Sequence, residues 1–185
     1  SIVVLTGDFL FAKAGSIAAE SGNIKIMKTL SDVYQKMAQG EIHQLLNKGS
    51  IEISEEEYFD VIRSKTGVLI EGACRVGALL ANASEQEEKA VALYGSWFGL
   101  VFQMIDDMLD YTADTDSLGK NVGTDLREGK LTLPVIYALK KANKDDRSFM
   151  EEIISSKIFS LEQFEQFKQL LIKYKGLEYV EGLAR

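Results

Sequence analysis

The segment Gly99–Asp116 reads GLVFQMIDDMLDYTADTD and joins an apolar run to three carboxylates within five residues. Asp is a poor helix former and like charges one turn apart repel, so Asp106, Asp107 and Asp110 destabilise a helix unless a cation lies between them. On a helix, Asp106, Asp110 and Gln103 share one face, whereas Asp107 is displaced by about 100°. Such oxygen ligands suit a hard cation such as Mg²⁺, which retains waters that a phosphate can replace.

The alternative is that these carboxylates form a solvent-facing acidic cluster, which is the usual explanation of a run of charge. The preceding residues 98–105, FGLVFQMI, are apolar on nearly every side of a helix, which predicts a buried helix. Buried carboxylates need partners. We therefore favour a metal site formed by Asp106, Asp107 and Asp110 over a solvated face.

Composition favours one globular domain that spans residues 1–185. The 185 residues are 46% hydrophobic with one Pro, which is enough for a sizeable core. There are 28 acidic and 21 basic residues, and the net charge is −7. A nucleic-acid-binding surface requires a basic excess, so we expect no nucleic-acid partner.

Cysteine content and hydropathy bear on where the protein resides. Cys74 is the only cysteine, which excludes an internal disulfide framework and fits a reducing, cytoplasmic location. No apolar stretch approaches the roughly 18 residues needed to span a bilayer. We therefore expect no stable membrane insertion.

Apolar residues recur at spacings of three and four along most of the chain, which predicts an all-α fold. Ser54 followed by Glu57 is a capping-box signal, so a helix should begin at residue 55. Ser84 gives a second start signal before the helix that carries the carboxylates. The expected helices span about 3–14, 23–46, 55–83 with an interruption near 66–67, 85–111, 132–142, 146–158 and 161–174. The polar segment 112–130 should be a long, functional loop.

Three lysines flank these carboxylates in the sequence. Lys120 and Lys130 lie among glycines in segment 112–130, and Lys65 with Thr66 lies at the expected helix interruption. Each lysine alone is more simply a solvated surface residue. Combined with the carboxylates, they suit a diphosphate, because a metal can bridge carboxylate and phosphate oxygens while lysines neutralise the remaining charge.

The segment 101–139, VFQMIDDMLDYTADTDSLGKNVGTDLREGKLTLPVIYAL, resembles the second aspartate-rich region of the trans-polyprenyl diphosphate synthases. The similarity covers FQ-x-x-DD-x-x-D followed by GK-x-x-G-x-D-x-x-EGK-x-TLP, in order. Segments 4–14 (VLTGDFLFAKA), 39–45 (QGEIHQL) and 64–81 (SKTGVLIEGACRVGALLA) also resemble this family. The resemblance therefore extends over most of the chain.

The resemblance implies an all-α, isoprenoid-synthase-type helical bundle around a central cavity, usually a homodimer. It implies a Mg²⁺-dependent prenyltransferase that condenses isopentenyl diphosphate with an allylic diphosphate to give a longer polyprenyl diphosphate. The implied roles are metal binding by Asp106, Asp107 and Asp110, diphosphate binding by Lys65, Lys120 and Lys130, and catalysis by Lys65, Thr66 and Gln103. Asp125 is implied to orient Lys130 or a metal-bound water.

The family's first aspartate-rich motif is not found in these residues. We therefore expect that this is the C-terminal part of the synthase domain, that N-terminal helices are missing and that the chain alone is inactive. An octaprenyl-type long chain is the expected product. One alternative is a non-catalytic partner subunit of a heteromeric synthase. A more remote one is a helical terpene cyclase, which the GK-x-x-G-x-D-x-x-EGK pattern disfavours.

Overall fold

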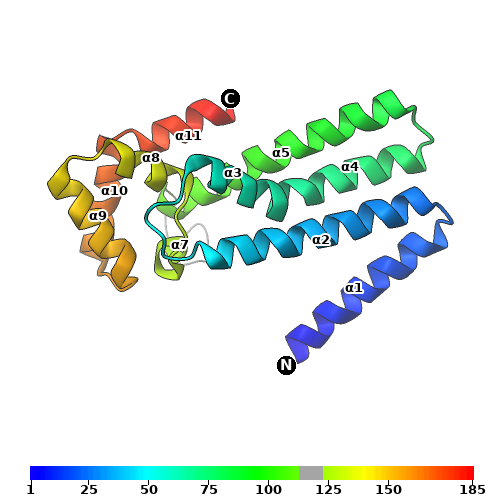
Figure 1. Cartoon of the computed structure of the whole chain (residues 1–185), viewed down its shortest axis with the longest axis horizontal. Helices are drawn as coiled ribbons and strands as arrows, with labels where there is room; N and C mark the ends of the chain where they lie inside the picture. Colours follow the sequence, from blue (N-terminus) through cyan, green and yellow to red (C-terminus); the bar gives the residue numbers. More distant parts are fainter. Residues whose placement is uncertain (113–122) are drawn as a thin grey trace.

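The regular elements of the computed structural model, which describes residues 1–112 and 123–185, are all helical, as predicted. In Figure 1, α1 and α2 form one hairpin and α4 and α5 a second, while α8 to α11 gather at one end of these long helices. The described helices are α1 (Ile2–Glu20), α2 (Ile24–Leu46), α3 (Glu55–Ile62), the π-helical turn η1 (Arg63–Gly67), α4 (Val68–Leu80), α5 (Glu85–Thr112), α7 (Thr124–Glu128), α8 (Leu133–Lys141), α9 (Lys144–Ser156), α10 (Leu161–Lys173) and α11 (Gly176–Ala184).

Local capping explains why α3 and α5 begin where the sequence predicts. The Ser54 hydroxyl accepts a hydrogen bond from the Glu57 amide at 3.1 Å, and the Glu57 carboxylate accepts one from the Ser54 amide at 2.7 Å. Ser84 and Glu87 repeat this arrangement at 3.4 and 2.8 Å. Each pair satisfies two amides that a helix N-terminus otherwise leaves unpaired. The interruption expected near residues 66–67 is confirmed as the turn η1.

Other predicted boundaries differ from the structure. Helix α1 continues through Gly15, because a single glycine lowers helix stability without ending the helix. Residues 124–128 of the expected long loop form the short helix α7, which is flanked by Gly123 and Gly129 in the left-handed conformation. Residues 113–122 lie outside the described residues. Helix α11 was not predicted.

The main core lies at the end of the molecule where α8, α10 and α11 pack together beside the C-terminal part of α5. Tyr111, at that end of α5, is fully buried and its ring stacks on that of Phe164 in α10, with 6.3 Å between centroids. The largest wholly buried side chains of this cluster include Leu126, Leu133, Met150, Ile153, Ile154, Phe167 and Leu171. This core fixes both the end of α5 and the short helix α7, which carry the acidic residues.

Glycines allow α5 to approach η1 and α4 closely. A Cβ atom on Gly99 would lie 2.7 Å from the Cα of Gly67, and one on Gly95 would lie 2.8 Å from the sulfur of Cys74. Distances this short leave no room for a side chain. The contact between Gly99 and Gly67 brings the turn that contains Lys65 and Thr66 against the face of α5 that carries Gln103.

The apolar run 98–105 is not buried on all sides, so that prediction is wrong within the described chain. Leu100 and Met104 are buried, whereas Phe98 and Phe102 are exposed and their rings stack at 6.5 Å. The two faces differ because η1 and α4 pack against one side of α5 only. Neither Phe98 nor Phe102 lines the cavity described below.

The prediction that no apolar stretch reaches membrane-spanning length is also wrong. Helix α1 is long and apolar enough, by length and composition alone, to cross a membrane, with a mean hydropathy of 1.6. Its charged residues before Glu20 are Asp8 and Lys13. Only Ala18 of this helix is buried in the structure. Core helices of soluble proteins and signal sequences meet the same criterion.

The glycine contact gives a prediction about stability. Gly99→Ala should destabilise the protein by about 1 kcal/mol or more, because overpacking costs about 1–3 kcal/mol and outweighs the roughly 1 kcal/mol gained in helix propensity. Gly77→Ala, in α4, is the matched control because a Cβ atom there meets nothing within 4 Å. It should stabilise by roughly 0.5–1 kcal/mol. Urea denaturation measures both, and equal effects would contradict the proposed close contact.

Candidate active site

A cavity of about 260 Å³ opens between α2, α3, η1, α5 and the segment that precedes α8. The predicted site residues that line it are Lys65, Thr66, Gln103, Asp106, Asp107 and Lys130. These residues come from three parts of the sequence. Asp110 is not among the lining residues, and Lys120 lies outside the described residues. The structure thus brings most of the predicted set to one cavity.

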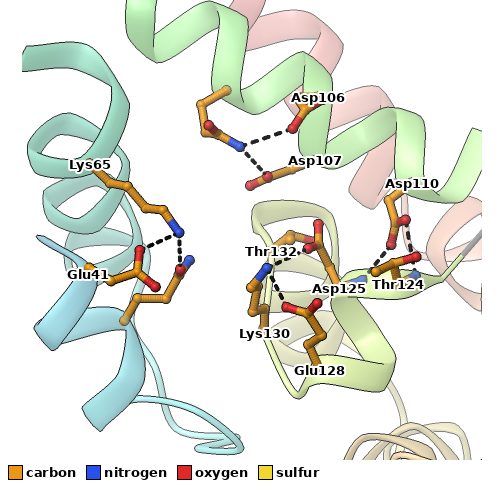
Figure 2. Close-up of polar contacts among 12 residues, drawn as sticks. Glu41, Lys65, Asp106, Asp107, Asp110, Thr124, Asp125, Glu128, Lys130 and Thr132 are labelled. Atoms are coloured by element: carbon orange, nitrogen blue, oxygen red, sulfur yellow. Dashed lines mark hydrogen bonds and ion pairs between the residues drawn. The ribbon is translucent and has the colours of Figure 1, made fainter. Parts of the chain in front are cut away.

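Lys65 lies on the side of the cavity formed by η1 and α2. Its Nζ atom is 2.7 Å from the Glu41 carboxylate and 2.7 Å from the Gln44 side-chain carbonyl, which accepts a hydrogen bond. Both contacts appear at the left of Figure 2. They hold the ammonium group at the cavity wall with its charge only partly compensated, because the Glu41 side chain is half exposed.

Lys130 lies on the opposite side of the cavity in Figure 2. Its Nζ atom is 2.6 Å from Glu128 Oε2 and 3.2 Å from Asp125 Oδ1. Burial lowers the pKa of Lys130, but the contacts with Glu128 and Asp125 outweigh burial and the pKa is raised above its ordinary value. Lys130 is therefore a fixed cation, and the implied orientation of Lys130 by Asp125 agrees with this contact.

Gln103 and Thr66 form a hydrogen-bonded pair that lines the same cavity. The Thr66 hydroxyl donates a hydrogen bond to Gln103 Oε1 at 2.7 Å. Gln103 Nε2 donates to Asp107 Oδ1 at 2.8 Å and, over a longer distance of 3.4 Å, to Asp106 Oδ2. Every polar group of the Gln103 amide is therefore engaged, which fixes its orientation.

Asp107 points into the protein, and only 6% of its surface is exposed. Its Oδ2 atom accepts a hydrogen bond from the Tyr58 hydroxyl at 2.8 Å. Burial, the largest cause, raises the pKa of Asp107 to about 7. Hydrogen bonds from Gln103 and Tyr58 oppose this rise, while the charges of Asp125 and Asp106 add to it. Both oxygens of Asp107 thus have donor partners within the protein.

Asp110 binds the backbone at the start of the short helix α7. Its two carboxylate oxygens accept hydrogen bonds from the amides of Thr124 at 3.1 Å and Asp125 at 3.0 Å. Burial and the charge of Asp125 raise the pKa of Asp110, and the two amides oppose that rise. The carboxylate therefore ties α7, and with it Asp125, to the end of α5. Its predicted role as a metal ligand stays a prediction.

Asp106 is the exposed member of the three carboxylates and faces the cavity (Figure 2). Within the described residues its one hydrogen bond is the 3.4 Å contact with Gln103. No group of three acidic, His or Cys residues in the described part of the chain is close enough to hold a metal ion alone. Mg²⁺ commonly takes one or two carboxylates and completes its shell with waters and phosphate oxygens. Asp106, with Asp125 also lining the cavity, fits that manner of binding.

Several residues that line the cavity were not singled out from the sequence. Tyr58, Gln44 and Lys48 are among them. Tyr58 lies seven residues before Lys65, a spacing that places two residues on one helix face, and this signal could have identified it.

The pKa of Glu128 is lowered first by Lys130 and then by Lys48 and Lys65, so the three lysines act on one carboxylate.

Helix arrangement and cavity together define an all-α protein of the isoprenoid-synthase type. The polyprenyl synthetase family model matches residues 1–171. The chain is 38% identical to octaprenyl diphosphate synthase of Haemophilus influenzae, over 98% of this chain and 55% of that protein. The chain belongs to the polyprenyl synthetase family, and it spans about half the length of the curated relatives it matches.

Solved structures support the same assignment. A polyprenyl synthase of Caulobacter crescentus, complexed with calcium and isoprenyl diphosphate, matches with a TM-score of 0.93 and 35% identity, over 98% of this chain and 55% of that chain. Decaprenyl diphosphate synthase of Rhodobacter capsulatus matches with a TM-score of 0.89 and 35% identity, over 98% and 56%. The resemblance to this family is thereby confirmed, and so is the predicted fold.

The buried Asp107 gives a prediction about pH. Its pKa is near 4 in the unfolded chain and about 7 in the folded one, so the folded state binds the extra proton between these values. The stability that Asp107 contributes is complete below pH 4 and is lost as pH rises through 7, by on the order of 4 kcal/mol. Asp107→Asn should flatten this decline in urea denaturation between pH 5 and 7.5. An equally steep decline in the variant would contradict the assignment.

Proposed function

We propose that this cavity is the diphosphate-binding side of a trans-prenyltransferase active site. The proposed reaction condenses isopentenyl diphosphate with an allylic diphosphate to give a polyprenyl diphosphate that is longer by one unit. The single observation that supports it most is the placement of Lys65 and Lys130 on opposite sides of one cavity, with Asp106 exposed to it. Two fixed cations and an available carboxylate match a metal-bound diphosphate.

Mg²⁺ is the proposed cofactor, and Asp106 would hold it, with Asp125 as a further oxygen donor. Its chemistry would be to neutralise charge on the diphosphate. The Caulobacter crescentus relative was solved with calcium and isoprenyl diphosphate, which supports a divalent cation in a related protein. Asp107 and Asp110 support this site indirectly, because each is already engaged by donors from the protein.

The two lysines would act on the leaving group. As the allylic carbon–oxygen bond breaks, the diphosphate departs with the bonding electron pair and gains negative charge. Lys65 and Lys130 lie where they can neutralise this charge, and such electrostatic stabilisation has the largest effect in a site from which water is excluded. The double bond of isopentenyl diphosphate then forms the new carbon–carbon bond, and loss of one proton restores an alkene.

Thr66 and Gln103 would face the allylic cation. The Thr66 hydroxyl uses its proton in the bond to Gln103, so its remaining lone pairs are free to face positive charge. Both residues line the same cavity as the two lysines that would hold the diphosphate. Their proposed role is therefore electrostatic stabilisation of a cation that has left its diphosphate.

Product length and assembly are also proposals. An octaprenyl product is supported by the identity to the Haemophilus influenzae enzyme, although a nonaprenyl diphosphate synthase of Rhodobacter capsulatus also matches, at 36% identity. A homodimer is supported by α1, whose Phe9, Leu10 and Phe11 are exposed in the chain as described. A cytoplasmic location, favoured by the single cysteine, stays a prediction.

A prenyl-transfer assay tests the proposed function. The full-length natural protein is incubated with Mg²⁺, farnesyl diphosphate and isopentenyl diphosphate, and products are identified by mass. Elongated products are expected, with none after metal removal by EDTA. Asp106→Ala should reduce turnover by roughly 100-fold or more, as does loss of one electrostatic group in other enzymes.

Asp145→Ala is the matched control, because Asp145 is exposed on α9 and does not line the cavity. It should leave turnover unchanged. Equal activity of the Asp106 and Asp145 variants would contradict the proposal that Asp106 holds the metal. Absence of any product from folded protein would favour the non-catalytic partner subunit, and cyclic hydrocarbons made without isopentenyl diphosphate would favour a cyclase.

A further inference from the structure

A chain of hydrogen bonds runs from the core to the cavity through Tyr58, Asp107, Gln103 and Thr66. The Tyr58 hydroxyl donates to Asp107 Oδ2 at 2.8 Å, Gln103 Nε2 donates to Asp107 Oδ1 at 2.8 Å, and the Thr66 hydroxyl donates to Gln103 Oε1 at 2.7 Å. The four residues come from α3, α5 and η1. We propose that Asp107 and Tyr58 are positioning residues that fix the orientation of Gln103 and Thr66, and that Asp107 does not bind the metal.

When Asp107 is ionised, the direction of each hydrogen bond in this chain is determined. A carboxylate can only accept, so the Gln103 amide must turn its NH₂ group toward Asp107. The Gln103 carbonyl oxygen then faces Thr66, whose hydroxyl proton is used in that bond. As a result the lone pairs of the Thr66 oxygen remain available in the cavity. Reversing the amide would place a donor against Thr66 and change the sign of the local dipole.

Tyr58 keeps Asp107 in this position. Only 3% of the Tyr58 surface is exposed, and its ring packs edge-on against Phe59 with 5.5 Å between centroids. Since a buried carboxylate oxygen needs a partner, the Tyr58 hydroxyl fixes which way Asp107 points. Tyr58 and Asp107 are 49 residues apart in the sequence, so this bond also joins α3 to α5.

An Asn at position 107 would not specify one orientation. Its amide could accept from Tyr58 and donate to Gln103, which would reverse the Gln103 amide, or it could do the opposite. Asp107→Asn should therefore allow both orientations while nearly conserving shape. Tyr58→Phe should have a weaker effect of the same kind, because it frees one oxygen of Asp107.

The functional consequence rests on the proposed function. If Thr66 and Gln103 stabilise the cation, loss of their orientation should lower kcat. Diphosphate affinity should not change, because Lys65, Lys130 and Asp106 provide that binding. If Asp107 were a metal ligand, its replacement would instead weaken Mg²⁺-dependent binding of the diphosphate.

Two readouts on the full chain test the inference. The first is proton exchange at the Gln103 side-chain amide in ¹⁵N-labelled protein, with the signal assigned from its loss in Gln103→Met. Exchange should be slow in the wild type and at least tenfold faster in Asp107→Asn. The second is affinity for inorganic pyrophosphate with Mg²⁺, which Asp107→Asn should leave within about twofold and Asp106→Ala should weaken at least tenfold.

Tyr111→Phe is the matched control, because Tyr111 is also buried and its hydroxyl accepts a hydrogen bond from Thr132 outside this chain of bonds. It should change neither readout, whereas Tyr58→Phe should speed Gln103 exchange. In the prenyl-transfer assay, kcat should fall at least tenfold in Asp107→Asn with little change in KM for isopentenyl diphosphate.

Two results would overturn the inference: unchanged Gln103 exchange in Asp107→Asn and Tyr58→Phe, or loss of pyrophosphate affinity in Asp107→Asn equal to that in Asp106→Ala. If the wild type makes no elongated product, the proposed function fails. The exchange and pyrophosphate measurements still decide the positioning role in that case, because neither depends on turnover.

Discussion

The contact between Gly99 of α5 and Gly67 of η1 is the constraint on which the site depends. A Cβ atom on Gly99 would lie 2.7 Å from the Gly67 backbone, so only glycine permits the two elements to lie this close. The same turn contains Lys65 and Thr66, and Gln103 follows Gly99 by one helical turn. The close approach therefore sets the 2.7 Å hydrogen bond between Thr66 and Gln103 and brings Lys65 to the cavity.

The three carboxylates on α5 coexist because each has a different environment. Asp107 accepts hydrogen bonds from Tyr58 and Gln103, and burial raises its pKa to about 7. Asp110 accepts from two backbone amides at the start of α7. Only Asp106 remains exposed with one long hydrogen bond in the described chain. The repulsion that the sequence suggests is thus largely resolved by the protein itself, and one carboxylate is left for a cation.

Much of the fold could be predicted from local signals. Ser54 with Glu57 and Ser84 with Glu87 located two helix starts, because capping depends on residues three positions apart. Helix α11 could not be predicted in this way, since none of the side-chain caps seen at α3 and α5 occurs at Lys175. The outward face of α5 was also missed, because apolar composition does not reveal which side another helix covers.

The candidate site, like the fold, could be predicted only in part. Lys65, Gln103, Asp106 and Lys130 were predicted, and they line one cavity. The sequence could not separate the roles of Asp106, Asp107 and Asp110. Their partners Tyr58 and the amides of Thr124 and Asp125 are between 14 and 49 residues away. Helical spacing predicts which residues share a face, but it does not predict what that face meets.

The central claim is that this cavity binds a diphosphate through Asp106-bound metal and the lysines on either side. Calorimetric titration of the wild-type protein with inorganic pyrophosphate, in Mg²⁺ and then in EDTA, tests it most directly. We predict binding in Mg²⁺ that weakens at least tenfold in EDTA, and that weakens in Mg²⁺ when Lys130 is replaced by Ala. Equal affinity in Mg²⁺ and EDTA, or no binding by folded protein in either, would contradict the claim.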